Sequence, residues 1–203
     1  MYPHFIEVVK EISRMHTVGI CTNLSIGAKE ITDNFDPCRV DLSISFHPHF
    51  SKLDDMLDKL NLLKSFHWPM KLMAVGWPPL IKDLDNYREI FKEFDFSVLP
   101  FWGQYNQKNY PMDYTEEEHY SVNRYIAKRE SKDFKTDPTR VKGRTCRAGQ
   151  VYAHIEPDGR VLRCSAGGEQ ISNNFYDDNF SFLNNPRLCN SEYCRCLEWV
   201  VCE

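Results

Sequence analysis

The sequence predicts an α/β fold with a parallel sheet of about four strands, followed by a small cysteine-rich β-hairpin domain. Three observations carry this prediction. Short apolar runs rich in β-branched residues alternate with amphipathic helical segments over residues 1–130. Further along, Pro157, Asp158 and Gly159 separate two runs of alternating apolar and polar residues, a pattern typical of a hairpin turn. Six of the eight cysteines lie after residue 145, on both sides of that turn.

The first elements follow from hydrophobic periodicity. Residues 3–15 place apolar side chains three and four positions apart, which predicts an amphipathic helix. Residues 18–21 form a short apolar run and residues 40–46 alternate apolar with polar positions, so both are predicted strands. Residues 53–66 return to helical spacing, with charged side chains on the opposite face. This order is that of repeated strand and helix units.

The same alternation continues along the chain. Residues 70–76, 84–94 and 96–101 are predicted as a strand, a helix and a fourth strand. Alternating strands and helices favour parallel pairing with right-handed crossovers. The sequence therefore indicates one sheet whose strands all run in the same direction.

A polar loop is predicted at residues 104–113, after the fourth strand. A helix follows at 115–129, because Thr115 and Glu118 have the spacing of a capping box. The next segment is charged and has little periodicity, so it is interpreted as a linker. These boundaries give a first domain at 1–130, a linker at 131–145 and a second domain at 146–203.

The amino-acid composition and net charge argue against some classes of partner and favour others. The chain has 203 residues, of which 42% are hydrophobic and 27% charged, enough for one substantial core. Its net charge of -4, with no dominant Lys/Arg stripe, argues against a nucleic-acid partner and favours a small-molecule or peptide substrate. No window approaches about 18 uncharged apolar residues and residues 1–15 have no apolar signal core, so we expect a cytoplasmic protein without a membrane partner.

The cysteines are the strongest chemical signal. In a reducing compartment they serve metal binding or catalysis more often than disulfides. Cys146 and Cys164 bracket the predicted hairpin, whose two strands would bring the thiolates near each other. The remaining ligands are expected among four closely spaced cysteines further on, namely Cys189, Cys194, Cys196 and Cys202. Short spacing of this kind predicts a cysteine-ligated iron-sulfur cluster.

Two other interpretations of the cysteines remain open. One is a structural zinc site with four cysteine ligands, although such sites usually contain two short Cys-x2-Cys knuckles and Cys146 and Cys164 are too far apart for one. The other is a set of unrelated buried thiols, each a small hydrophobic residue. Cys21 and Cys38 have no closely spaced partner and are predicted to be such thiols.

The segment from Cys146 to Cys164 resembles the start of the auxiliary-cluster domain of radical S-adenosylmethionine enzymes, of the SPASM and twitch type. That signature has a Cys, nine to fifteen residues, a Gly, four residues and a Cys. Here twelve residues separate Cys146 from Gly159 and four separate Gly159 from Cys164. The later cysteines depart from the full SPASM spacing, so the likeness is to the smaller twitch version with a single 4Fe-4S cluster.

The first half of the chain resembles the third and fourth strands of the radical SAM barrel, through residues 20–24 and 41–48. This likeness implies that the predicted strands are part of an incomplete (βα) TIM-like barrel. It also implies that Ser43, Ser45 and, more weakly, Asn23 are candidates for binding the ribose of S-adenosylmethionine in the full-length parent.

The resemblance has one decisive gap. The Cys-x3-Cys-x2-Cys loop that ligates the radical-generating cluster is absent, as is the Gly-Gly-Glu-Pro segment that binds the methionyl amine. We therefore expect a cluster-binding, C-terminal part of a radical SAM enzyme, whose N-terminal segment or reductase is supplied separately. The alternative is a zinc- or cluster-stabilised binding module without enzymatic activity.

Overall fold

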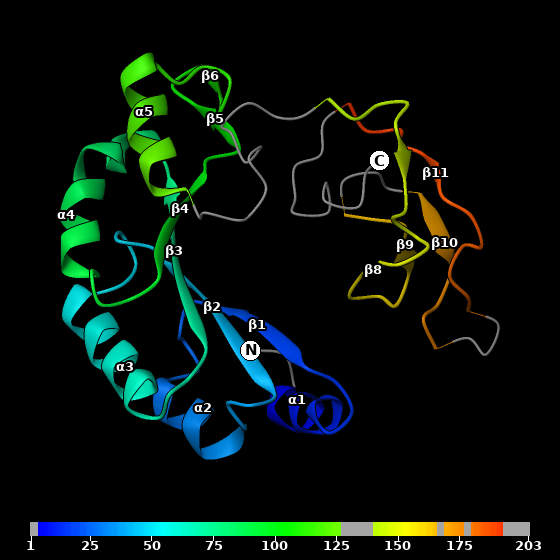
Figure 1. The fold of residues 1–203 in the computed structure, drawn as a ribbon, viewed down its shortest axis with the longest axis horizontal. Coiled ribbons are helices and arrows are strands. Elements are labelled where there is room, and N and C mark those ends of the chain that lie inside the picture. The colour runs from blue at the N-terminus through cyan, green and yellow to red at the C-terminus, as the bar shows by residue number, and fades with distance from the viewer. Residues whose placement is uncertain (1–3, 127–139, 166–168, 177–179, 193–203) are drawn as a thin grey trace. The chain divides into compact units, whose positions relative to one another are not determined.

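The computed structural model describes residues 4–126, 140–165, 169–176 and 180–192 (Figure 1). The chain divides into two compact units, Met1–Thr136 and Asp137–Glu203. Most of the linker expected at 131–145 therefore lies outside the described residues. None of the helices in the described ranges is long and apolar enough to cross a membrane.

The first unit is built on a four-stranded parallel sheet. The strands follow chain order: β1 (Val18–Thr22), β2 (Val40–Phe46), β3 (Met70–Gly76) and β4 (Phe96–Pro100). Their register places Ile44 opposite Thr22 on one side and opposite Leu72 on the other. The predicted α/β fold with about four parallel strands is confirmed in this coarse form.

Helices alternate with the strands, as predicted. They are α1 (Phe5–Ser13), α2 (Ala28–Asn34), α3 (Leu53–Ser65), the 3-10 turn η1 (Pro78–Asp83) and α4 (Leu84–Ile90). Figure 1 shows α2, α3 and α4 along the same side of the sheet. The core lies between these layers, where Leu42 and Ile44 of β2 meet Leu60 of α3 and Phe91 beyond α4.

Helix α2 and a short β-hairpin are among the elements of the first unit that were not predicted. Helix α2 has only seven residues and buries only Ala28 and Ile31, which is too little periodicity for a sequence pattern. Residues predicted as a polar loop instead form a hairpin of β5 (Gly103–Tyr105) and β6 (Lys108–Tyr110). Its strands are mostly exposed, so no apolar alternation marks them.

Helix α5 (Glu116–Tyr125) confirms the predicted capping box. The Glu118 amide donates to the Thr115 hydroxyl at 3.2 Å, and the Thr115 amide donates to the Glu118 carboxylate at 2.8 Å. These bonds satisfy two backbone donors that a helix start would otherwise leave unpaired. The cap fixes where the chain turns back after the β5–β6 hairpin.

The second unit contains only short strands within its described residues. They are β7 (Thr145–Cys146), β8 (His154–Ile155), β9 (Val161–Leu162), β10 (Gln170–Ser172) and β11 (Arg187–Leu188). Strands β8 and β9 pair antiparallel across the predicted turn, where the Gly159 amide donates to the Glu156 carbonyl at 2.9 Å. Strand β10 pairs with β9, and β11 pairs with β7. The turn is as predicted, but the ladder is much shorter than the expected cysteine-rich hairpin.

Candidate metal centre

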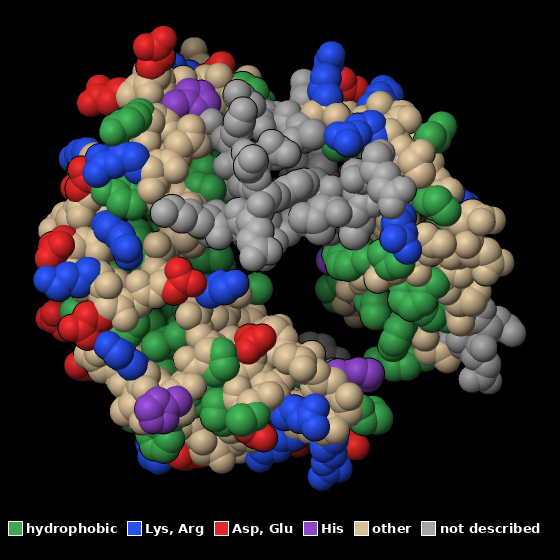
Figure 2. Space-filling model, in the orientation of Figure 1, with side chains coloured by type: hydrophobic (Ala, Val, Ile, Leu, Met, Phe, Trp, Pro, Cys, Tyr) green, Lys and Arg blue, Asp and Glu red, His purple; other side chains and the backbone are tan. Residues whose placement is uncertain are grey.

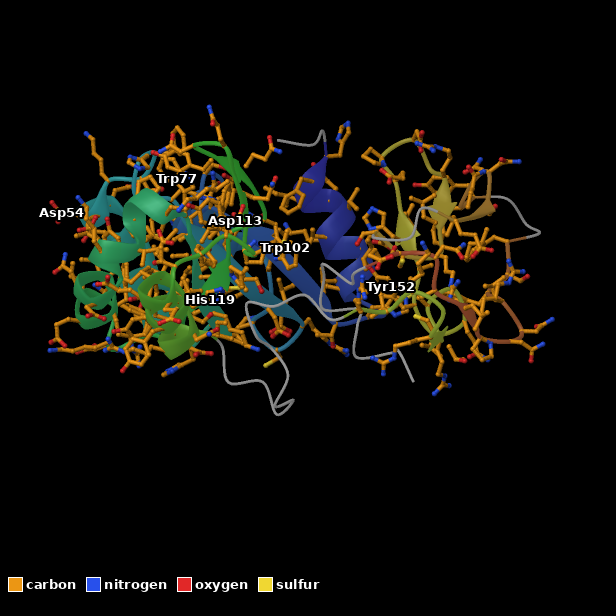
Figure 3. The ribbon with its side chains drawn as sticks, turned by 90° about the horizontal axis from the view of Figure 1, so that it is seen from above. Asp54, Trp77, Trp102, Asp113, His119 and Tyr152 are labelled. Carbon is orange, nitrogen blue, oxygen red and sulfur yellow. The ribbon has the colours of Figure 1, made fainter. Side chains whose placement is uncertain are left out.

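Three of the cysteines predicted as ligands lie together in the second unit. Cys146 and Cys164 are 5% and 9% exposed and form a buried cluster with Ala148. Cys189 is half-buried and packs against this cluster, as does Tyr152, which Figure 3 labels. The other candidate ligands, Cys194, Cys196 and Cys202, lie outside the described residues.

The contacts that bring the cysteines together differ from the expected hairpin clamp. The β8–β9 ladder pairs only His154 with Leu162 and Ile155 with Val161, so it does not extend to Cys146. Cys146 instead lies on β7 and pairs with Arg187 of β11. Cys189 directly follows β11, and its amide donates to the carbonyl of Arg144 at 2.9 Å. Pairing of β7 with β11 therefore brings Cys189 beside Cys146.

A buried arginine joins the segments that carry these cysteines. Arg163 is 4% exposed, and its guanidinium donates to four backbone carbonyls. The acceptors are Ala148 at 2.8 Å, Cys146 at 3.0 Å, Arg187 at 2.6 Å and Leu188 at 2.8 Å. Sequence reasoning missed Arg163, although a charged residue between Leu162 and Cys164 at the end of an apolar run was a usable signal.

Glu169 balances the charge of this arginine. Its carboxylate accepts from Arg163 at 3.2 Å and also pairs with Arg187. The Arg163 amide donates to the Glu169 carbonyl at 2.7 Å. A buried cation is costly unless it is paired and hydrogen-bonded, and Arg163 has both kinds of partner.

Gly149 allows the backbone to pass close to Arg163. Its φ is +85°, and a Cβ there would lie 2.8 Å from Arg163 Cγ and 2.8 Å from Leu183 Cδ1. The Gly149 amide donates to the Tyr152 carbonyl at 2.6 Å, and the Leu183 amide donates to the Gly149 carbonyl at 2.8 Å. Only glycine combines this left-handed conformation with this approach.

The described part of the chain contains no group of three or more His, Cys, Asp or Glu side chains arranged to hold a metal ion. That search covers Cys146, Cys164 and Cys189 of the predicted ligands. These three contribute sulfur donors to a mostly apolar cluster, which is the donor type that soft metals and iron-sulfur clusters prefer. The donor chemistry therefore suits the predicted group.

The candidate residues of the first unit lie on or beside β1 and β2. Ser43 and Ser45 are half-buried on the face of β2 opposite the buried Leu42 and Ile44. Asn23 is exposed after β1, and its side-chain oxygen accepts from the Ser25 amide at 3.1 Å. The structure thus places the two serines on one face of the sheet, whereas Asn23 makes a local turn.

Aromatic side chains gather where the strands of the first unit end. The Trp77 ring lies 5.1 Å from the His49 ring and 5.3 Å from the Tyr105 ring, centroid to centroid. Figure 3 labels Trp77 and Trp102 in this unit. An open groove of about 460 Å³ lies beside Tyr105 and is also lined by Pro78 and Lys82. Ligands commonly bind at the carboxyl end of a parallel sheet, and Pro78 of this groove follows the carboxyl end of β3.

Tyr114 joins the ends of β3 and β4. Its hydroxyl donates to the Gly76 carbonyl at 2.5 Å and accepts from the Phe101 amide at 2.9 Å. Burial is the main reason why the pKa of Tyr114 is raised to about 12. The neutral phenol, which can donate to Gly76, is therefore the form that the folded chain favours.

Charges are mixed over the helices of the first unit. Figure 2 shows acidic and basic side chains interspersed on this face. Some of them pair, as Lys59 does with Asp55 and Lys64 with Glu93, each at 2.7 Å. The face of the first unit shown in Figure 2 therefore has no large patch of one charge sign.

No family model matches this chain, and the searches of curated proteins and of solved structures found no similar protein.

Proposed function

We propose that the second unit binds a cysteine-ligated iron-sulfur cluster of the 4Fe-4S type. The observation that carries the proposal is the shared burial of Cys146 and Cys164, with Cys189 packed against them. The fourth ligand comes from Cys194, Cys196 or Cys202, which follow Cys189 in the sequence. In a reducing compartment, a pattern of several cysteines is more often metal-binding or catalytic than a disulfide framework.

The chain's own residues make the site. Cys146, Cys164 and Cys189 supply sulfur donors, and Arg163 and Gly149 hold the backbone around them. When bound, a cluster of this kind exchanges single electrons or binds a substrate group. The apolar surroundings limit access of water to the sulfurs.

The wider proposal is that the chain is the cluster-binding part of a radical S-adenosylmethionine enzyme. The parallel sheet supports it, because Ser43 and Ser45 lie on the sheet face opposite the main core and could contact a nucleoside there. The groove beside Tyr105 would then face a small-molecule or peptide substrate. The four strands would belong to an incomplete barrel. Radical chemistry needs the Cys-x3-Cys-x2-Cys loop, which these 203 residues lack.

A second candidate is a structural zinc site in a binding module without enzymatic activity. The shortness of all the strands among the described residues of the second unit favours it, since units with little regular structure often depend on a metal for folding. The same cysteines would then bind one zinc ion in tetrahedral geometry.

Elemental analysis of anaerobically purified chain distinguishes these candidates. Iron with inorganic sulfide and a brown colour support the cluster, whereas one equivalent of zinc supports the second candidate. Cys146→Ala and Cys164→Ala should abolish binding. Cys21→Ala and Cys38→Ala are matched controls, because both thiols belong to the first unit and, contrary to the prediction that they are buried, are exposed; they should leave binding intact. Loss of the cluster in Cys21→Ala would show that the site is misassigned.

A further inference from the structure

The hydrogen bonds of Arg163 converge on the cysteines of the second unit. Arg163 directly precedes Cys164 in the chain. One of its bonds goes to the carbonyl of Cys146 itself, and another goes to the carbonyl of Leu188, next to Cys189. Cys146 therefore accepts a bond from Arg163, Cys164 follows Arg163 in the chain, and Cys189 follows a residue that Arg163 binds.

Arg163 has four backbone carbonyl acceptors in addition to the Glu169 carboxylate. A guanidinium has five donors in a rigid plane, and buried ones most often face carboxylates. Here four bonds go to backbone carbonyls in two segments, 146–148 and 187–188. These segments are far apart in sequence, and between β7 and β11 only two residue pairs form a ladder. Arg163 thus supplies much of the bonding that holds them together.

We propose that Arg163 is a positioning residue that holds together the backbone segments carrying the three cysteines before a metal or cluster arrives. This inference rests on the proposed function, because it assumes that the cysteines are ligands. It adds that these backbone segments are already held together in the metal-free chain, whereas the thiols take up ligand geometry only when the metal binds. Most small metal sites are instead ordered by the metal itself.

Replacing Arg163 with lysine tests whether the shape of the guanidinium matters apart from its positive charge. Arg163→Lys keeps a cation opposite Glu169 but replaces the planar fork with a single ammonium group, which cannot reach four carbonyls at once. Arg160→Lys is the matched control, because Arg160 lies three positions earlier, is exposed and pairs with Asp158. We expect Arg163→Lys to weaken cluster or zinc binding about 10-fold or more, as loss of residues that orient ligands usually does. Arg160→Lys should bind as the wild type does.

Amide hydrogen exchange of the metal-free chain tests pre-organisation directly. The Cys189 and Leu183 amides, which donate to Arg144 and Gly149, should be protected in the wild type and exchange faster in Arg163→Lys. The Glu156 amide, at the hairpin turn, should be unchanged. Equal acceleration at all three positions would show a general structural role and overturn the inference.

Chemical rescue supplies a readout that packing alone would not move. In Arg163→Ala, millimolar guanidinium chloride should restore part of the metal uptake, while sodium chloride at the same concentration should not. Failure of guanidinium to restore any uptake overturns the inference, as does wild-type affinity with an unchanged electron paramagnetic resonance spectrum in Arg163→Lys. A wild-type chain that takes up neither iron nor zinc overturns the proposed function instead.

Discussion

Gly149 is the position where one added methyl group tests the packing around the cysteine cluster. Its φ is +85°, and an alanine Cβ would lie 2.8 Å from both Arg163 Cγ and Leu183 Cδ1. Gly143 is a matched control in the same unit, with a φ of +79° and nothing within 4 Å of an added Cβ. Alanine therefore strains the backbone at both positions, but it displaces neighbours only at Gly149.

The magnitudes follow from these two costs. A left-handed alanine costs about 1–2 kcal/mol relative to glycine. Crowding of a packed site adds about 1–3 kcal/mol. We therefore expect Gly143→Ala to lower the free energy of unfolding of the second unit by about 1–2 kcal/mol and Gly149→Ala by about 2–5 kcal/mol.

Urea unfolding followed through the amide NMR signals of the second unit measures this difference. Gly149→Ala should also take up less metal, because the displaced neighbour is Arg163. If the two variants lose the same stability and bind metal equally, then the side chains around Gly149 can move to accommodate the added methyl group without a loss of free energy. The packing argument for this site would then be wrong.

Three further predictions concern the first unit. Tyr114→Phe should lower the free energy of unfolding by about 1–3 kcal/mol at neutral pH, since it leaves two buried backbone groups unsatisfied. Because the pKa of Tyr114 is raised to about 12 from 10.0, this contribution is complete below pH 10 and is lost as the pH rises toward 12. Urea unfolding at several pH values should show that the difference in unfolding free energy between the wild type and Tyr114→Phe becomes smaller as the pH rises. Tyr120→Phe is the control, because Tyr120 is exposed and its replacement should leave the unfolding free energy unchanged. Thr115→Ala should cost about 1 kcal/mol in thermal unfolding followed by circular dichroism, and Thr115→Ser should restore most of it. Gly76→Ala should cost about 1–3 kcal/mol, because its Cβ would lie 2.8 Å from a side chain of α5, whereas Gly19→Ala has open space; equal melting temperatures for these two variants would contradict the packing there.

The sheet could be predicted from the sequence because its signals are local. The alternation from Val40 to Phe46 places successive residues on opposite faces, and the strand has the expected bounds. Thr115 and Glu118 likewise form their cap within a few residues. Helix α2 and the β5–β6 hairpin escaped prediction because few of their side chains are buried, and burial is what creates a pattern.

The candidate site could be predicted only in part, because its geometry depends on distant contacts. Cysteine spacing pointed to Cys146 and Cys164, and the structure brings them into one cluster. The pairing of Cys146 with Arg187 joins residues about forty positions apart over a ladder of two residues, which leaves no periodic trace. The sequence likewise does not identify the acceptors of Arg163, since they are backbone atoms that any residue supplies, although a charged residue at the end of an apolar run marks the position itself.

The bonding of Arg163 to backbone atoms affects which positions of the second unit can change during evolution. Arg163 binds the carbonyl oxygens of Arg187 and Leu188, so its bonds do not depend on which side chains those positions carry. The Leu188 side chain is 62% exposed, so a different side chain there would disturb little packing. We therefore expect position 188 to vary more freely than positions 149 and 163, whose replacement would disturb the contacts described above. In diverged descendants, a lone arginine and a glycine would be a more durable mark of this architecture than the strand sequences that surround them.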